Sequence, residues 1–331
     1  MTVRMSEKLR VGIIGCGSMG ELHARCLRDI EGVALASFCD VEESRAQQLK
    51  EQFNGGDTTV EAGQVFRDDA IDVVYICTHH DSHAGLAIEA IEQGKHVFME
   101  KPLALNIEDA MTIGTALKRK TVSFMVGFKL RFNPSVEKTR AFIRKPVLSI
   151  GQVTDVRWPD SFWGNDPEKG GGNVLSQGCH AMDLLRFVHR SEPVRVYAEG
   201  GNFGHPRFDI IDNMVATISF ADGAVSTVAV GDSGKTSVVS KFSFQFMDGS
   251  KSAHLYNRLK SVALSDGSRE TRYHCREELG LVNMNKVFVN TLLRNDAPPV
   301  TFYDGLQATR MMIAAFESLK TGLPRDIPRQ D

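Results

Sequence analysis

Three glycines with a fixed spacing stand where a strand is expected to turn into a helix. The run GCGSMG, Gly15–Gly20, follows the apolar segment Leu9–Gly15 and opens the helical pattern Met19–Asp29. The first glycine permits a tight turn, the second removes a Cβ that would block a pyrophosphate, and the third lets helix and strand pack closely. Free N–H groups at the start of the helix can then bind phosphate oxygens. The pattern predicts a dinucleotide site.

An acidic residue follows at the position of a ribose-binding carboxylate. Asp40 ends the apolar segment Val33–Asp40, 20 residues after Gly20. A carboxylate there accepts hydrogen bonds from ribose hydroxyls and repels a 2′-phosphate. The sequence therefore predicts NAD as the cofactor. NADP is the alternative, because Arg45 could turn to a 2′-phosphate, and Asp40 could instead cap the helix Glu42–Phe53.

Strands alternate with helices through the first 130 residues. Such alternation, with helices of 10–15 residues, is typical of βαβ units and a parallel sheet. After Asp40, the strands are expected at Ile71–Thr78 and in the segments KHVFME and TVSFMVGF, and the helices at Glu42–Phe53, Ser82–Gln93 and Asn106–Lys120.

Beyond residue 190 the pattern changes to alternating strands joined by Asp-Gly steps. The pairs Asp222-Gly223, Asp248-Gly249 and Asp266-Gly267 each separate two apolar runs. Such a step supplies the positive φ angles that tight hairpins need. We expect a sizeable antiparallel sheet, with one helix before it near Ser176–Val188 and one after it at Gly305–Leu319.

The composition is that of an ordinary globular protein. Its 331 residues suffice for about two domains, with 42% hydrophobic and 24% charged residues. A net charge of −2 gives no electrostatic drive for binding nucleic acid. The longest apolar runs are far shorter than the ~20 residues that cross a bilayer, so no membrane association is expected. The N-terminus shows no signal peptide, and the six scattered cysteines indicate a cytoplasmic protein with reduced thiols and no metal site.

Several motifs occur in an order that resembles one enzyme family. GIIGCGSMGELH is followed by the pair Thr78 and His83, by VFMEKPLA, by GFKLRFNP at Gly127–Pro134, and by GGGNVLSQGCHAMDLL at Gly170–Leu185. The chain resembles the Gfo/Idh/MocA family, which includes glucose–fructose oxidoreductase and inositol dehydrogenases. EKP combined with the GGG…GxHxxD block identifies this family much more selectively than the glycine run alone, which many enzymes share.

The resemblance implies an α/β protein of two domains. Residues 1–130 would form a Rossmann domain that binds NAD(P). Residues 131–331 would form an α+β domain with a large, mainly antiparallel open sheet, which binds substrate and mediates oligomerisation. The implied activity is NAD-dependent hydride transfer to or from a secondary hydroxyl or ketone of a sugar, cyclitol or sugar derivative. A homodimer or homotetramer is expected.

The resemblance also assigns residues to the chemistry. His180 is the expected proton acceptor, because an imidazole titrates near neutral pH. Lys101 would hydrogen-bond the same substrate oxygen, and the two could exchange roles. Asp183, three residues after His180 on the same helix face, could bind the imidazole or a substrate hydroxyl. The peptide before Pro102 is often cis in the family.

Two groups of residues are expected to bind ligands. The expected cofactor-binding residues are Gly15, Cys16, Gly17, Ser18, Met19, Gly20, Asp40, Thr78, His83, Glu100 and Lys101. The expected substrate-binding residues are Arg131, Asn133, Trp163, Asp166, Ser176 and His180.

One departure from the family pattern leaves alternatives open. Many members carry aspartate four residues before the histidine, where this chain has Ser176. A serine cannot act as a carboxylate orienter. Ser176 supports one alternative, a non-catalytic nucleotide-binding regulatory protein of the same fold. The other alternative is an NADPH-favouring reductase of keto-sugars or imines.

Overall fold

The computed structural model describes residues 8–235, 238–275 and 280–328. The chain divides into two compact units. The first joins Met1–Gly127 with Leu281–Leu306, and the second joins Phe128–Gly280 with Gln307–Asp331. The segment 281–306 thus returns to the first unit, which the strand–helix alternation of the sequence does not reveal.

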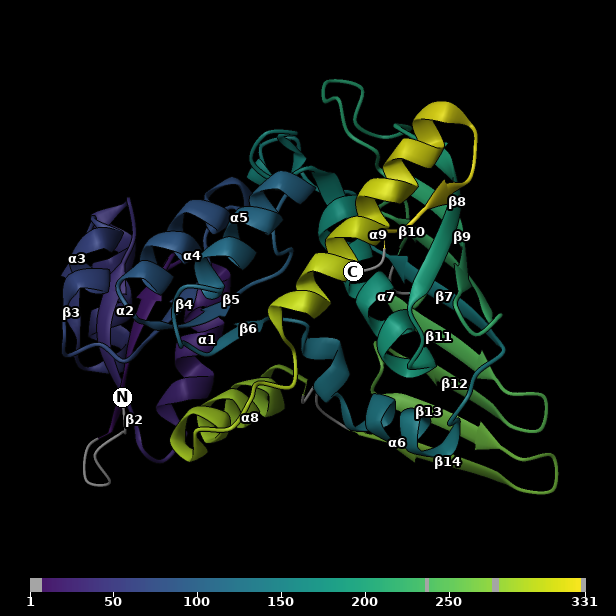
Figure 1. Ribbon diagram of the computed structural model, residues 1–331, viewed down its shortest axis with the longest axis horizontal. Coiled ribbons are helices and arrows are strands. Elements are labelled where there is room, and N and C mark those ends of the chain that lie inside the picture. Colours follow the sequence, from purple (N-terminus) through teal and green to yellow (C-terminus); the bar gives the residue numbers. More distant parts are fainter. Residues whose placement is uncertain (1–7, 236–237, 276–279, 329–331) are drawn as a thin grey trace. The chain divides into compact units, whose positions relative to one another are not determined.

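The first unit is a parallel sheet of six strands with helices on its faces (Figure 1). The order β3-β2-β1-β4-β5-β6 is that of a dinucleotide-binding fold, and the order reverses between β1 and β4. The strands are β1 (Leu9–Ile14), β2 (Val33–Cys39), β3 (Asp57–Thr59), β4 (Val73–Ile76), β5 (His96–Met99) and β6 (Phe124–Val126). The helices are α1 (Ser18–Arg28), α2 (Glu43–Phe53), α3 (Ala62–Arg67), α4 (His83–Glu92), α5 (Ile107–Leu117) and α8 (Gly280–Arg294).

The central strands are buried on both faces because helices cover each side. Every residue of β4 is buried, as its run Val73–Ile76 predicts for the interior of a parallel sheet. Helix α5 begins where the sequence predicts, since the side-chain oxygen of Asn106 accepts the N–H of Asp109. The short elements β3 and α3 were not predicted, because three and six residues carry too little periodicity.

The second unit is built on a sheet of nine strands. Its order is β14-β13-β12-β11-β7-β10-β9-β8-β15, and among the described strands β7 and β10 are the pair that runs parallel. The strands are β7 (Leu148–Thr154), β8 (Pro193–Gly201), β9 (Asn213–Phe220), β10 (Val225–Gly231), β11 (Phe242–Met247), β12 (Ser252–Tyr256), β13 (Ser261–Ser265), β14 (Glu270–His274) and β15 (Arg325–Asp326). The helices are α6 (Pro134–Phe142), α7 (Gly172–His189) and α9 (Phe302–Thr321), of which α9 starts in the first unit. The α/β fold with a mainly antiparallel second sheet is confirmed.

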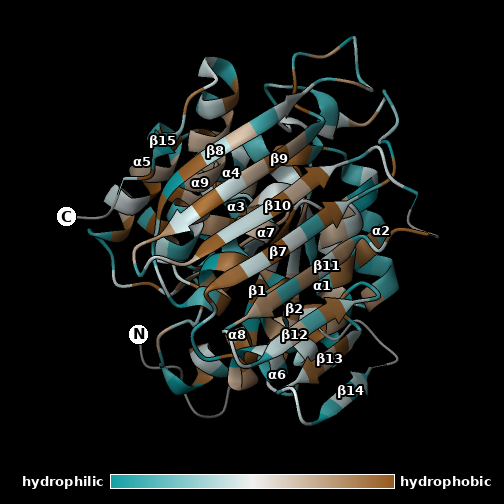
Figure 2. Ribbon diagram, turned by 90° about the vertical axis from the view of Figure 1, so that its right-hand side faces the viewer, coloured by the Kyte–Doolittle hydropathy of each residue, from teal (hydrophilic) through white to brown (hydrophobic). Residues whose placement is uncertain are grey.

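The helices cover one face of this sheet, and Figure 2 shows the opposite face. Burial alternates along β7 and β9, with the buried side chains on the helix side. The opposite face carries exposed apolar side chains on three adjacent strands: Leu148, Ile150, Val215 and Val225.

The hairpin turns fall where the Asp-Gly steps predict, but the aspartates have another role than expected. Gly223, Gly249 and Gly267 have φ of +88°, +94° and +85°, whereas no aspartate in the described residues has a positive φ. Each aspartate instead accepts backbone N–H groups of its own turn, as Asp248 does from Lys251 at 2.7 Å. The expectation of one helix after the sheet was also wrong, because α8 precedes α9.

Candidate active site

The glycine run forms the cradle that a dinucleotide requires. Gly15 has a φ of +90°, and a Cβ there would lie 2.6 Å from the Cys77 carbonyl oxygen. A Cβ at Gly20 would lie 2.0 Å from the Gly15 oxygen, so helix α1 could not approach the loop. Gly17 has no heavy atom within 4 Å of its Cβ position, and no side chain caps α1. The start of α1 therefore offers open space and backbone donors to a pyrophosphate.

The Asp40 carboxylate is held at the end of β2, next to this loop. One oxygen accepts the N–H of Cys16 at 2.8 Å, and the other accepts the N–H of Glu42 at 2.9 Å. Each oxygen keeps acceptor capacity for a ribose hydroxyl. Arg45 pairs with Glu42 at 2.8 Å, so its charge is directed to that carboxylate. This arrangement leaves the Asp40 carboxylate able to bind the ribose hydroxyls of a dinucleotide.

The thiols around the loop are not nucleophiles. Burial, together with the negative charge of Asp40, raises the pKa of Cys16 to about 12 and that of Cys39 to about 11. All six cysteines are free thiols. Their roles here are packing and, for Cys16, donation of a backbone N–H.

Lys101 follows β5 in a turn that is held at both ends. Its N–H donates to the Glu100 carboxylate at 3.2 Å, and the Lys101–Pro102 peptide is cis, as the family resemblance implied. His83 Nδ1 donates to the Pro102 carbonyl at 2.8 Å, and burial lowers the pKa of this histidine. The Thr78 hydroxyl pairs with Ser82 at 2.7 Å. These residues gather at the carboxyl ends of β4 and β5.

Helix α7 carries a buried polar stripe. Ser176, His180 and Asp183 lie four and three residues apart, which places them on one face of the helix. His180 is packed edge-on between the rings of Phe128, at 6.1 Å, and Phe242, at 6.4 Å. The helix begins at Gly172, four residues before the predicted start.

The stripe extends to a residue that the sequence analysis missed. Asn173, three residues before Ser176, is fully buried, and its amide has no hydrogen-bond partner among the described residues. Its spacing of three from Ser176 and seven from His180 was the available signal.

Asp183 and Arg131 bind each other. The guanidinium makes a bidentate pair with the carboxylate, with Nε 2.9 Å from Oδ2 and Nη2 2.5 Å from Oδ1. Both side chains are buried, and the Arg131 guanidinium lies 4.8 Å from the Phe187 ring. Asn133 uses its side-chain oxygen to accept the N–H of Ser135 and cap α6. The pair therefore ties the segment before α6 to helix α7.

The segment between β7 and α7 places its aromatic side chains together. Phe162 packs on Trp158 at 5.0 Å and on Trp163 at 5.2 Å between ring centres. Asp166 accepts the N–H of Glu168 at 2.9 Å, and its carbonyl accepts the N–H groups of Gly170 and Gly171. The segment 155–171 is therefore an ordered loop with its own packing, which we name the tryptophan loop.

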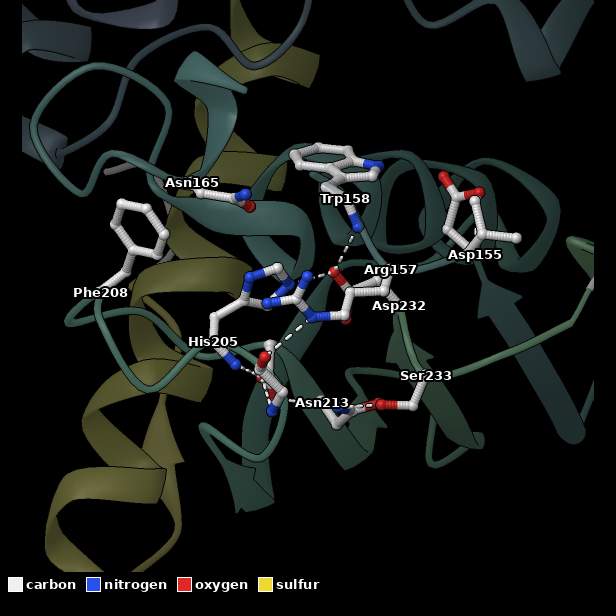
Figure 3. A network of polar contacts seen from close by, with 12 residues as sticks. Asp155, Arg157, Trp158, Asn165, His205, Phe208, Asn213, Asp232 and Ser233 are labelled. Atoms are coloured by element: carbon white, nitrogen blue, oxygen red, sulfur yellow. Dashed lines mark hydrogen bonds and ion pairs between the residues drawn. The ribbon is translucent and has the colours of Figure 1, made fainter. Parts of the chain in front are cut away.

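A buried histidine anchors the tryptophan loop (Figure 3). His205 Nε2 lies 2.7 Å from Asp232 Oδ2, which also accepts the N–H of Trp158 at 3.3 Å. Arg157 donates to the Gly204 carbonyl at 2.9 Å. The sequence carries no signal for this network, because bonded members such as Trp158 and Asp232 are 74 residues apart.

His205, Asp212 and Asp232 are close enough to be considered as metal ligands within the described part of the chain. The Asp212 carboxylate, however, accepts the N–H groups of Phe203, Gly204 and His205 at 2.6–3.1 Å, and the Asn213 amide at 2.9 Å. N–H dipoles directed at the same oxygens repel a cation. The chemistry of this donor set therefore favours a hydrogen-bonded anchor.

None of the described helices combines the length and the apolar character that crossing a membrane requires.

Comparison with known proteins places the chain among oxidoreductases. It is 26% identical to the uncharacterised oxidoreductase YrbE of Bacillus subtilis (98% of both chains). It is also 26% identical to the myo-inositol 2-dehydrogenase of Thermotoga maritima (94% of this chain, 96% of the relative). The structure of an oxidoreductase domain protein from Kribbella flavida superposes with a TM-score of 0.89 at 21% identity, over 99% of this chain and 100% of that one. An oxidoreductase from Agrobacterium radiobacter, solved with NAD+, L-tartaric acid and magnesium, gives 0.85 at 18% identity, over 97% and 98%.

Two family models cover most of both sheets. The model of the oxidoreductase family with an NAD-binding Rossmann fold matches residues 9–128, and that of the Gfo/Idh/MocA C-terminal domain matches residues 146–246. Their order along the chain is the order of the motifs in the sequence. The chain belongs to the Gfo/Idh/MocA family of oxidoreductases.

Proposed function

We propose that the protein is an NAD-dependent dehydrogenase acting on a secondary hydroxyl or ketone of a sugar, cyclitol or sugar derivative. The observation that carries the proposal is the open phosphate cradle at Gly17 beside the Asp40 carboxylate, in a chain that also keeps Lys101 and His180. The relatives named myo-inositol and scyllo-inositol 2-dehydrogenase support a polyol substrate.

The first unit binds the cofactor in this proposal. Gly15–Gly20 hold the pyrophosphate, and Asp40 accepts hydrogen bonds from the ribose hydroxyls. Thr78, His83 and Glu100 line the part of the cofactor site next to Lys101, at the carboxyl ends of β4 and β5. When bound, NAD accepts a hydride from the substrate carbon or returns one to it. NAD is favoured over NADP because Arg45 is directed to Glu42.

Two residues manage the proton of the reacting hydroxyl. His180 accepts it, and Lys101 hydrogen-bonds the same oxygen and stabilises its alkoxide character. Arg131 and Asp183 support this chemistry indirectly: their buried ion pair holds in place the face of α7 that carries His180. Ser176, Asn133, Trp163 and Asp166 are proposed to line the substrate side, where hydroxyl, amide, carboxylate and aromatic groups suit a polyol.

The proposal also extends to assembly and location. A homodimer or homotetramer in the cytoplasm fits the exposed apolar strip on the second sheet and the six reduced thiols. No nucleic-acid or membrane partner is proposed.

Turnover with a substrate panel tests the function directly. Reduction of NAD or NADP is followed with inositols, aldoses and sugar acids, and the reverse reaction with keto-sugars and imines. We expect NAD-linked oxidation of at least one polyol. NADPH-linked reduction alone would favour the reductase, and nucleotide binding without any turnover would favour a regulatory protein.

A further inference from the structure

A histidine in helix α1 lies buried between two hydrogen-bond acceptors. His23 Nε2 is 2.9 Å from Glu100 Oε1, at the residue before Lys101. His23 Nδ1 is 3.1 Å from Asn285 Oδ1, on helix α8. All three residues belong to the first unit, and both His23 and Asn285 are fully buried.

The orientation of the Asn285 amide is determined by a second bond. Its nitrogen donates to the Leu281 carbonyl at 2.9 Å. Turning the amide over would bring its oxygen against that carbonyl oxygen, which is also an acceptor. The amide oxygen therefore faces His23, and His23 Nδ1 must carry a hydrogen.

These hydrogen bonds require one proton more than a neutral histidine and an ionised glutamate carry together. A neutral histidine has one N–H, and Asn285 requires it at Nδ1. A lone pair on Nε2 would then face a carboxylate oxygen at 2.9 Å, in surroundings formed by the rings of Tyr75 and Phe98. That contact is repulsive, so a second proton must lie between Nε2 and Oε1. An imidazolium with a carboxylate, or an imidazole with a carboxylic acid, satisfies the geometry, and both are neutral overall.

We propose that His23 and Glu100 hold one captive proton, imposed by Asn285, and that this neutral pair positions Lys101. The second Glu100 oxygen accepts the Lys101 N–H at 3.2 Å. Gly127 provides the room, because a Cβ there would lie 3.0 Å from Glu100 Oε1. The pair thus fixes the backbone of Lys101 without adding net charge beside it. The positioning role rests on the proposed function; the captive proton does not.

Four titratable side chains near the pair carry no net charge near pH 7. Burial raises the pKa of Cys26, Tyr75 and Cys77 and lowers that of His83, so these four side chains are neutral near pH 7. Lys101 directly follows Glu100. Arg25 lies two residues after His23 and Lys286 one residue after Asn285, and both of these side chains are exposed.

Nuclear magnetic resonance can count the protons without any turnover. Histidine is labelled with ¹⁵N and glutamate with ¹³C in the cofactor-free, full-length protein. At about pH 7.5 we expect the spectra to show either a hydrogen on both nitrogens of His23 or a hydrogen on Nδ1 together with a protonated Glu100. A neutral His23 facing an ionised Glu100 near pH 7.5 would overturn the captive proton.

Asn285→Leu is the matched variant. It removes the acceptor at Nδ1 while keeping a side chain of similar shape. His23 can then carry its single hydrogen on Nε2 and donate it to an ionised Glu100. At the same pH we expect the pair in this variant to hold one proton fewer than in the wild type, and an unchanged proton count would overturn the role given to Asn285.

The positioning role is tested by kinetics. His23→Phe keeps a ring but leaves Glu100 without its donor, so we expect kcat to fall roughly 10- to 100-fold, the cost of a misplaced catalytic group. The KM for NAD should change less than about threefold, and the control His254→Gln should change neither. Thermal unfolding is measured first, and His23→Leu replaces His23→Phe if the latter does not fold. Unchanged kcat in a folded variant would overturn positioning, whereas an active Lys101→Ala would overturn the proposed function and leave the proton count standing.

Discussion

Lys101 and His180 differ in their surroundings, although the proposed chemistry uses both. Lys101 is half-buried at a strand end, whereas His180 is buried between two phenylalanine rings. Lys101 can therefore be replaced with little loss of packing, whereas the buried His180 requires a conservative replacement that has a smaller effect on folding.

Replacing either residue should abolish most turnover. We expect Lys101→Ala and His180→Gln to bind NAD and lose on the order of 10²–10⁴ in kcat, the scale of positioned acid–base catalysis. The double variant should lose less than the product of the two effects if both residues act on one oxygen, as proposed. Steady-state kinetics with the substrate found in the panel checks this, and near-native turnover in either single variant would refute that residue's role.

Asp40 should determine the choice of cofactor. Asp40→Ser removes the charge that repels a 2′-phosphate, so the preference for NAD over NADP should narrow by about 1–3 kcal/mol. Binding of NAD itself should also weaken, since Asp40 holds the N–H of Cys16 in the phosphate loop. Calorimetric titration of both nucleotides measures the two effects, and a wild-type preference for NADP would contradict the assignment.

At the scale of elements, the last turn of α7 is joined to the sheet by a buried histidine. His189 Nε2 lies 2.9 Å from the Ser149 hydroxyl on β7 and 3.1 Å from that of Ser226 on β10. Its ring stacks on Phe220 at 4.2 Å. Burial lowers the pKa of His189 from 6.5 to about 4.

This histidine should make folding sensitive to acid. The unfolded chain protonates His189 near pH 6.5 and the folded chain only near pH 4, so the free energy of unfolding falls as the pH drops through that window. At the acid end of this window, the free energy of unfolding is lower by about 3 kcal/mol. Urea unfolding at several pH values should show this loss in the wild type and not in His189→Gln. Parallel pH profiles of the two proteins would contradict it.

The tryptophan loop should depend on His205. Both tryptophans of the chain lie in this loop, so intrinsic fluorescence reports on it alone. His205→Ala removes the donor to Asp232, which holds the Trp158 backbone. We expect stronger acrylamide quenching and a higher substrate KM with a smaller change in kcat. His254→Ala is the control, and unchanged quenching would show that the loop holds without this anchor.

The sequence predicted the elements that carry strong local signals. The glycine run, the β-branched strand at Val73–Ile76 and the Asn106 cap all have short-range causes, and each lies where it was expected. The pairing of Arg131 with Asp183 and the His205 network could not be predicted, because their partners are 52 and 27 residues apart. Helix α8 was missed because the apolar pattern after the sheet was assigned to one helix.

For the whole molecule, the strip of apolar side chains on the second sheet predicts assembly. Val215 on β9 is 54% exposed, Val225 on the neighbouring β10 is 41% exposed, and Ile150 on β7, the next strand beyond β10, is 42% exposed. We expect light scattering to return a dimer or tetramer of the 36.6 kDa chain, and Val215→Asp to shift it toward the monomer. A monomeric wild type at micromolar concentration would contradict this surface as an interface.

The return of residues 281–306 to the first unit bears on how the chain is made. Phe288 of α8 packs 5.6 Å from Phe98 and 6.0 Å from Tyr75, and Asn285 reaches His23. Domains made first usually fold first during synthesis. The cofactor-binding unit of this chain cannot be completed early, because eight of the nine strands of the second sheet, all but β15, are synthesised before α8, which covers that core. The half of the protein that is translated first is therefore completed only after most of the half that follows.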